Sequence, residues 1–188
     1  TAQVLAEQGY AKASTNRIAE RAGVSVGSLY QYFPNKDALF QALIARHVSA
    51  QNSAFSELFS ASLGSPPKAL ITQAVRALVA SHRVQPELHM LLIGQLGGLE
   101  QAAELLTLDT RAIQALEAYF HVHATALRPM DNPRLVAEVI VFAVEAVVHR
   151  SMMQPGKLED PTLERELVRL VEGYLLPGSS KAATSKSH

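Results

Sequence analysis

The fold is decided by residues 14–40, STNRIAERAGVSVGSLYQYFPNKDALF. Ser14 can accept a hydrogen bond from the free N–H groups at the start of a helix. Gly23 follows the apolar face of that helix and can end it, because glycine adopts a positive φ without a steric penalty. Ser25 can begin a second helix, which Pro34 stops because the residue before a proline disfavours the α conformation. Two short helices around a turn that contains glycine are typical of a helix-turn-helix.

The second of these helices has a surface suited to a DNA groove. Leu29 and Phe33 are four residues apart on one face, and we expect them to pack inward. The opposite face then carries Gly27, Ser28 and Gln31, where the glycine and serine are small enough for the helix to lie deep in a major groove.

Tyrosines flank this face. The hydroxyl groups of Tyr30 and Tyr32 can reach phosphates, and Lys36 supplies a cation at the start of the next helix. Phosphate contacts position such a protein, whereas contacts to base edges specify the sequence. The alternative is a helical hairpin whose tyrosines only fill a core.

From Ser14 to Leu39 the chain carries the motif S-T-x-x-I-A-x-x-A-G-V-S-x-G-S-L-Y-x-Y-F-x-x-K-x-x-L. In this motif it resembles the TetR family of transcriptional repressors. The resemblance implies an all-α homodimer with an N-terminal helix-turn-helix domain that binds DNA and a larger helical domain for effector binding and dimerisation. Carried over by position, the residues that would face DNA are Thr15, Asn16, Ser25, Val26, Gly27, Ser28, Tyr30, Tyr32 and Lys36. Because Val26 and Gly27 have no hydrogen-bonding side chains, we expect a thymine methyl contact or DNA shape to supply much of the sequence preference.

The composition is that of a soluble globular protein, with 48% hydrophobic and 18% charged residues. The formal net charge is zero, but the first 47 residues carry five Lys or Arg against three Asp or Glu, a weak basic bias in the expected DNA-binding part. The absence of cysteine excludes disulfides and thiol chemistry and fits a cytoplasmic protein. No segment resembles a signal peptide, and no apolar run reaches the ~18 residues of a membrane span.

We expect three segments: a DNA-binding domain (1–47), a ligand-binding and dimerisation domain (48–177) and a disordered tail rich in Ser, Lys and Ala (178–188). One helix from Lys36 to about Ser62 should cross the first boundary and transmit motion between the domains. The chain begins without methionine, inside a helix that Gly9 would end. Since the first helix of the family is longer at its start, we expect its opening to be missing from this sequence.

From Lys68 onward, apolar residues recur at intervals of three and four, which predicts helices over 71–82, 88–99 and 113–127. Polar residues interrupt these stripes, and His149 lies on the stripe of a later helix. A mostly apolar pocket with a few polar groups is typical of an effector site. The predicted pocket residues are His82, Leu91, Gln95, Phe120, His123, Phe142 and His149. The alternative for each histidine is a hydrogen bond to a backbone carbonyl.

The segment from Arg134 to Met153 is apolar on nearly all sides and must therefore be covered all round. We expect one side to meet the core and another side to meet a second subunit, together with the helix that follows Pro155 and Gly156. The predicted interface residues are Val136, Ile140, Val144, Val147, Leu167, Leu170 and Tyr174. Glu138 and Glu145 are candidates for an interface ion pair with Arg134 or Arg150. A symmetric dimer would read a palindrome.

These features predict a homodimeric repressor, released from double-stranded operator DNA by a small apolar or aromatic effector. We expect no cofactor and no metal site, because His121 and His123 are two positions apart and diverge on a helix. An enzyme is not expected, since no nucleophile lies in a strand-turn-helix context and no glycine-rich loop could hold a phosphate. Two alternatives stay open: a DNA-independent helical carrier of apolar ligands, and an activator on the same fold.

Overall fold

The computed structural model describes residues 1–95 and 102–177. All regular elements in this part of the chain are helices, as the sequence predicted. In chain order they are α1 (Ala2–Lys12), α2 (Thr15–Ala22), α3 (Val26–Tyr32), α4 (Lys36–Ser62), α5 (Pro67–Arg83), α6 (Pro86–Gln95), α7 (Ala102–Val122), the 3-10 turn η2 (Ala124–Ala126), α8 (Pro133–Met152) and α9 (Pro161–Leu175).

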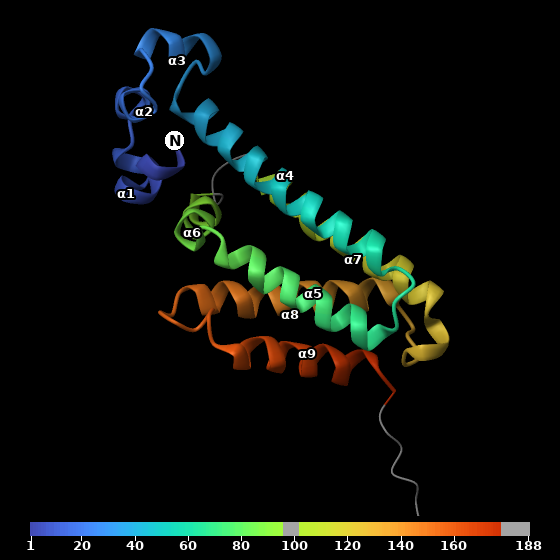
Figure 1. The fold of residues 1–188 in the computed structure, drawn as a ribbon. Helices are drawn as coiled ribbons and strands as arrows, with labels where there is room; N and C mark the ends of the chain where they lie inside the picture. Colours follow the sequence, from blue (N-terminus) through green and yellow to red (C-terminus); the bar gives the residue numbers. More distant parts are fainter. Residues whose placement is uncertain (96–101, 178–188) are drawn as a thin grey trace, which may run out of the picture.

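Helix α4 joins two bodies of unequal size (Figure 1). It begins in the small bundle of α1, α2 and α3 and then runs along the larger body, where it packs against α5 and α7. Asn35 starts this helix, because its side-chain oxygen accepts a hydrogen bond of 2.8 Å from the Ala38 N–H. The expected domain boundary near residue 47 falls inside α4, so the two bodies share one rigid element.

Two apolar cores lie on either side of this boundary. The N-terminal core contains buried side chains of α1 to α4, and it also includes Leu88 and Leu92 of α6. The C-terminal core is built from α5, α7, α8 and α9 together with Phe59 of α4. Helix α6 therefore completes the core of the small body, and it packs directly against α1.

Gly9 (φ 70°, ψ 167°) has non-helical geometry, so it ends the first helical segment of α1, as expected, and a second short segment continues to Lys12 beyond the kink. One helix end differs from expectation. The helix expected over 113–127 ends at Val122, and Leu127 lies beyond the 3-10 turn, where its side chain is buried. The tail 178–188, expected to be disordered, lies outside the described residues.

Candidate nucleic-acid interface and histidine cluster

The turn between α2 and α3 is defined by local hydrogen bonds. The Ser14 side chain accepts one from the Arg17 N–H at 3.3 Å, and Ser25 Oγ accepts one from the Ser28 N–H at 2.9 Å. Gly23 ends α2 in the left-handed region, at φ 69° and ψ 27°, where a side chain would be strained. The predicted caps and the predicted turn glycine are thus confirmed.

Helix α3 lies at the outer end of the small body (Figure 1). Leu29 anchors it in the N-terminal core, while Tyr32 at its end keeps 79% of its surface exposed. The exposed members of the predicted DNA-facing set are Asn16, Ser25, Gly27, Ser28, Tyr30 and Tyr32. Small and hydrogen-bonding side chains therefore cover a helix face that is open to a ligand as large as DNA.

The remaining members of that set also make contacts inside the chain. Thr15 Oγ1 lies 3.1 Å from the Tyr30 hydroxyl oxygen and so ties the start of α2 to α3. Lys36 Nζ donates a hydrogen bond of 2.9 Å to the Tyr10 carbonyl oxygen and sits 4.2 Å above the Tyr10 ring. Val26 is half-buried against the N-terminal core. Lys36 therefore ties α4 to α1, a role that spacing along the sequence did not reveal.

The predicted pocket residues do not gather in one place. Phe120 is buried in the C-terminal core, and Leu91 packs against the N-terminal core. His123 donates from Nε2 to the Leu63 carbonyl oxygen at 2.9 Å and stacks on Tyr119. Phe142 is 50% exposed, so it does not line an interior pocket.

Of the seven predicted pocket residues, the structure brings two together. His82 Nε2 lies 3.2 Å from His149 Nε2. The side chain of Gln95 lies outside what the structure describes.

His82 and His149 belong to a larger cluster that the sequence did not predict. His89 of α6 is buried, and its Nε2 lies 3.1 Å from His149 Nε2. The other ring nitrogen of His89, Nδ1, lies 2.8 Å from Nε2 of His47 on α4. We call these four residues the histidine cluster; they come from α4, α5, α6 and α8. Their separation in the sequence hides the cluster, and the only available signal was four histidines on helices expected to pack together.

Burial keeps the histidine cluster uncharged at neutral pH. It lowers the pKa of His89 to about 3, with further lowering by the other three imidazoles. Burial, followed by the charge of His82, lowers the pKa of His149 to about 4. The pKa values of His47 and His82 are also lowered, mainly by burial. Neutral imidazoles carry a lone pair on one nitrogen, which is the form that binds metal ions.

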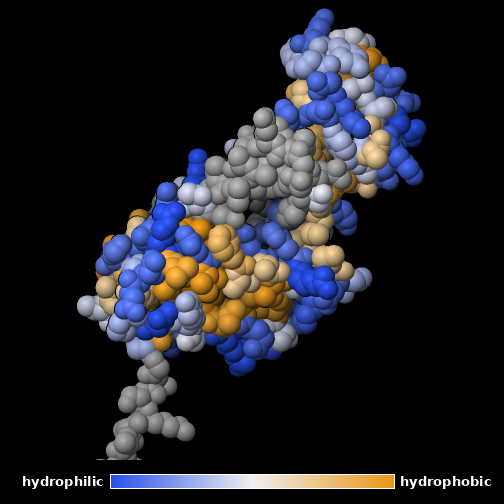
Figure 2. Space-filling model, turned by 180° about the vertical axis from the view of Figure 1, so that it is seen from behind, coloured by the Kyte–Doolittle hydropathy of each residue, from blue (hydrophilic) through white to orange (hydrophobic). Residues whose placement is uncertain are grey.

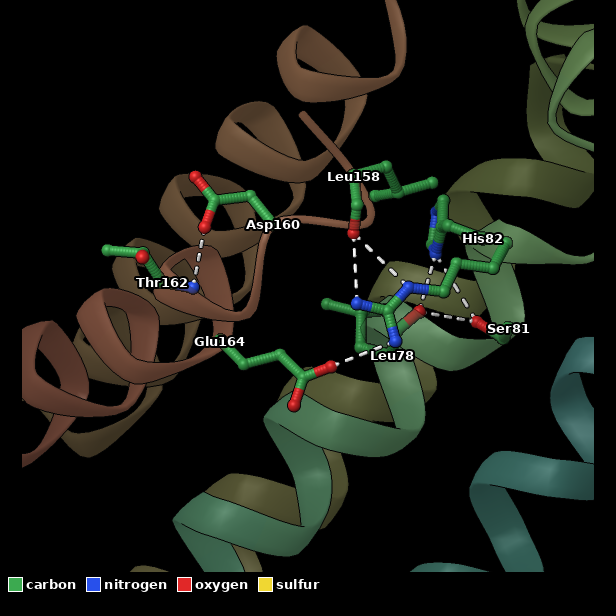
Figure 3. Close-up of polar contacts among 8 residues, drawn as sticks. Leu78, Ser81, His82, Leu158, Asp160, Thr162 and Glu164 are labelled. Atoms are coloured by element: carbon green, nitrogen blue, oxygen red, sulfur yellow. Dashed lines mark hydrogen bonds and ion pairs between the residues drawn. The ribbon is translucent and has the colours of Figure 1, made fainter. Parts of the chain in front are cut away.

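The end of α5 is fixed by polar contacts beside His82 (Figure 3). His82 Nδ1 donates to the Leu78 carbonyl oxygen at 2.8 Å, which fixes the imidazole ring on its own helix. The neighbouring Arg83 donates from Nε and Nη2 to the Leu158 carbonyl oxygen, at 3.2 and 3.0 Å, and pairs with Glu164 at 3.1 Å. These contacts tie α5 to the segment between α8 and α9 and to Glu164 of α9 itself.

The structure corrects which side of α8 meets the core. Val136, Ile140 and Val144, predicted for a subunit interface, are buried in the C-terminal core of the chain itself. Leu167 of α9 is buried there too. The physical reason is that α8 packs against α5, α6 and α7, and α9 packs against α5, within the same chain. These four side chains are therefore not available to a second subunit.

A different face of α8 is open. Its large exposed apolar side chains are Leu135, Val139, Phe142 and Val147; Met153, directly after α8, and Leu170 of α9 are exposed as well. Apolar residues gather over the larger body on the face seen from behind (Figure 2). Val147 and Leu170, both predicted for the interface, are among the exposed residues, whereas Tyr174 is half-buried beneath Arg128. Arg134 and Glu138 form their ion pair within α8, at 3.3 Å.

Two family models match the chain. The model described as bacterial regulatory proteins, tetR family, matches residues 1–43, and the model described as tetracyclin repressor-like, C-terminal domain, matches residues 66–175. Among the described residues, no helix is long and apolar enough to cross a membrane.

Curated proteins match short stretches of the chain. The chain is 52% identical over 40 residues to the nucleoid occlusion factor SlmA of Haemophilus ducreyi, which covers 21% of this chain and 20% of that protein. It is 46% identical over 46 residues to the HTH-type transcriptional activator FasR of Mycolicibacterium smegmatis, covering 24% and 21% of the two chains. The matches thus span about a fifth of the length of these relatives.

Solved structures share the fold over nearly the whole chain. The transcriptional regulator FadR from Bacillus subtilis in complex with stearoyl-CoA has a TM-score of 0.70 at 19% identity, covering 90% of this chain and 92% of that chain. The SmeT–triclosan complex has a TM-score of 0.69 at 18% identity, covering 95% and 88%. At these identities the likeness shows a common fold.

Proposed function

Because the chain belongs to the tetR family of bacterial regulatory proteins, we propose that it is a homodimeric repressor that leaves a palindromic operator when a small effector binds. The proposal rests chiefly on one observation, the capped helix-turn-helix with an open α3 face. Residues 1–47 bind the DNA in this proposal, and residues 48–177 bind the effector and the second subunit.

The exposed face of α3 enters the major groove. Ser25 and Ser28 reach base edges or phosphates through their hydroxyl groups, and Gly27 lets the helix approach closely. Tyr32 contacts a phosphate from the end of the helix. With so few hydrogen-bonding groups at the centre, part of the sequence preference comes from DNA shape.

Dimerisation uses the exposed apolar face of α8 and α9. Contiguous exposed apolar patches mark protein–protein interaction sites in many proteins. Val139 and Phe142 of α8 and Leu170 of α9 are exposed, and the proposed contact uses these three side chains. A two-fold axis through this face places two copies of α3 on one side of the dimer, about 34–36 Å apart or a multiple of that distance.

The effector is apolar or aromatic in this proposal. The solved structures of similar fold contain triclosan in SmeT and stearoyl-CoA in FadR, and both ligands are largely apolar. Effector binding favours a state in which the spacing of the two DNA-binding bodies no longer matches successive major grooves. The free-energy shift towards this state equals the difference in effector binding free energy between it and the DNA-binding state.

An activator is the second candidate, because a stretch of 46 residues is 46% identical to the activator FasR. An activator would bind the same DNA and differ only in the sign of its effect. A DNA-independent carrier of apolar ligands would not use α3 at all.

A mobility shift with the DNA upstream of the protein's own gene tests the proposal. We expect retardation that resists competitor DNA and weakens steeply with salt, because phosphate contacts release counterions. Tyr32→Ala should weaken the shift, while a carrier would bind its apolar ligand unchanged. A reporter gene behind the same DNA separates a repressor from an activator. Retardation that competitor DNA abolishes would contradict a specific regulator.

A further inference from the structure

The histidine cluster brings three ring nitrogens to one point. Nε2 of His82 and Nε2 of His89 lie 3.2 and 3.1 Å from Nε2 of His149. The three side chains offer ligand atoms that all lie within 4.8 Å of one another. The residues belong to α5, α6 and α8, so packing of three separate helices creates this convergence.

These distances are close to those of a tetrahedral metal site. Zinc binds imidazole nitrogen at about 2.0–2.1 Å, so two nitrogens on one tetrahedral zinc ion are about 3.3–3.4 Å apart. The two measured separations are shorter by only a few tenths of an ångström, which small side-chain rotations can supply. The remaining pair of ligand atoms, on His82 and His89, lies within 4.8 Å, so one ion beside His149 Nε2 is within reach of rotated side chains of all three residues.

Hydrogen-bond partners of the imidazole rings determine which ring nitrogen carries the proton and which one keeps the lone pair that a metal ion needs. His82 Nδ1 donates to the Leu78 carbonyl oxygen at 2.8 Å, which leaves the lone pair on Nε2. His89 Nδ1 faces His47 Nε2 at 2.8 Å, and donation in that direction leaves the lone pair of His89 on Nε2 as well. Partners of this kind orient metal-binding histidines in general. A proton on His149 Nε2 can be donated to His82 Nε2 or to His89 Nε2, but not to both at once. A cation, by contrast, can be bound by the lone pairs of all three nitrogens together.

We propose that His82, His89 and His149 bind one divalent transition-metal ion of the zinc class through their Nε2 atoms. Imidazole is a preferred ligand of zinc, copper, iron and nickel, whereas magnesium and calcium prefer oxygen. Three protein ligands leave a fourth position, which water fills. His47 is a positioning residue that holds the ring of His89.

The site also connects to the small body. His89 lies on α6 next to Leu88, and both Leu88 and Leu92 belong to the N-terminal core that α1 shares. An ion that joins His89 to α5 and α8 fixes α6 against the larger body and, through α6, fixes the placement of α1. This second step depends on the proposed DNA-binding function: occupancy by the metal ion changes the affinity for the operator.

Calorimetric titration of the metal-free full chain with zinc chloride tests the site. We expect one ion per chain. His149→Gln should weaken binding by about 100-fold or more, and His47→Gln should weaken it by about 10-fold because it removes only a supporting contact. His121→Gln is the matched control, since His121 is exposed on α7, and it should bind zinc like the wild type.

Three outcomes would overturn the site: no stoichiometric binding, unchanged binding in His149→Gln, or a loss in His121→Gln equal to that in His149→Gln. Circular dichroism establishes that each variant is folded, and His47→Gln keeps all three ligands if His149→Gln does not fold. Cobalt in place of zinc should give the strong visible absorption of a tetrahedral ion, whereas weak absorption of octahedral type would contradict the geometry.

The coupling is read from mobility shifts with and without zinc. We expect the operator affinity to change several-fold in the wild type and to stay constant in His149→Gln. An equal affinity with and without zinc would refute the coupling. Absence of any specific shift would refute the regulator function while leaving the zinc titration intact, so the two failures are distinguishable.

Discussion

Phe142→Ser should split the dimer while leaving the subunit folded. The Phe142 side chain is 50% exposed on the open face of α8. A phenylalanine buries about 150–250 Å² when it is fully covered, so about 100 Å² remains for a partner to cover. The dimer contains two copies, and about 200 Å² at about 25 cal/mol per Å² amounts to about 5 kcal/mol for complete coverage. If only half of this is realised, the dissociation constant rises by about 100-fold.

Sedimentation velocity over a dilution series measures this constant. Val139→Ser and Val122→Ser form a matched pair, because both valines are exposed on helices but only Val139 lies on the open face of α8. We expect Val139→Ser to weaken the dimer by less than Phe142→Ser and Val122→Ser to leave it unchanged. A Phe142→Ser protein that stays as dimeric as the wild type would refute the assigned interface.

Three further predictions concern the other parts of the molecule. Tyr32→Ala should weaken operator binding by about 10-fold in a mobility shift, the loss of about one hydrogen bond, and should change the unfolding free energy by less than about 0.5 kcal/mol because the ring is exposed. Arg83→Met should lower the free energy of urea unfolding by about 1–3 kcal/mol, since it removes the hydrogen bonds to Leu158 and the pair with Glu164. The metal-free protein should lose stability as the pH falls below 6.5, because unfolding raises the pKa of His89 from about 3 to its ordinary 6.5 and the unfolded chain then binds more protons. At pH 5 the loss from His89 is about 2 kcal/mol, measured by urea unfolding at pH 7 and pH 5.

Each of these three predictions has a result that would contradict it. Equal operator affinity in Tyr32→Ala would remove this ring from the DNA contact. Unchanged urea unfolding of Arg83→Met would show that its contacts to Leu158 and Glu164 add no net stability. A His89→Gln protein that loses as much stability between pH 7 and pH 5 as the wild type would assign the pH dependence to other groups.

The helix-turn-helix could be predicted from sequence because its determinants are local. Ser14, Gly23, Ser25 and Asn35 each act on residues within four positions, so reading the chain in order finds them. Lys36 differs, because its contacts with Tyr10 join residues that are 26 positions apart.

Which side of α8 is buried and which is exposed could not be predicted, because contacts between distant parts of the chain decide it. A helix that is apolar on nearly every side has no polar face to mark its orientation, so periodicity cannot tell which apolar positions face the core and which face outward. In the structure Ile140 is buried and Phe142 is exposed. The histidine cluster needed the packing of four helices, and His89 falls beside its apolar stripe instead of on it. Tertiary contacts alone decide such features.

Selection of binding sites from a pool of random duplex DNA, with the full chain at fixed salt, shows whether the dimer reads a specific sequence. We expect enrichment of a palindrome whose half-sites are one helical turn apart, or a multiple of a turn, and the loss of that enrichment in Phe142→Ser at concentrations where the variant is monomeric. A pool that stays random after repeated rounds with dimeric wild-type protein would contradict a sequence-specific regulator.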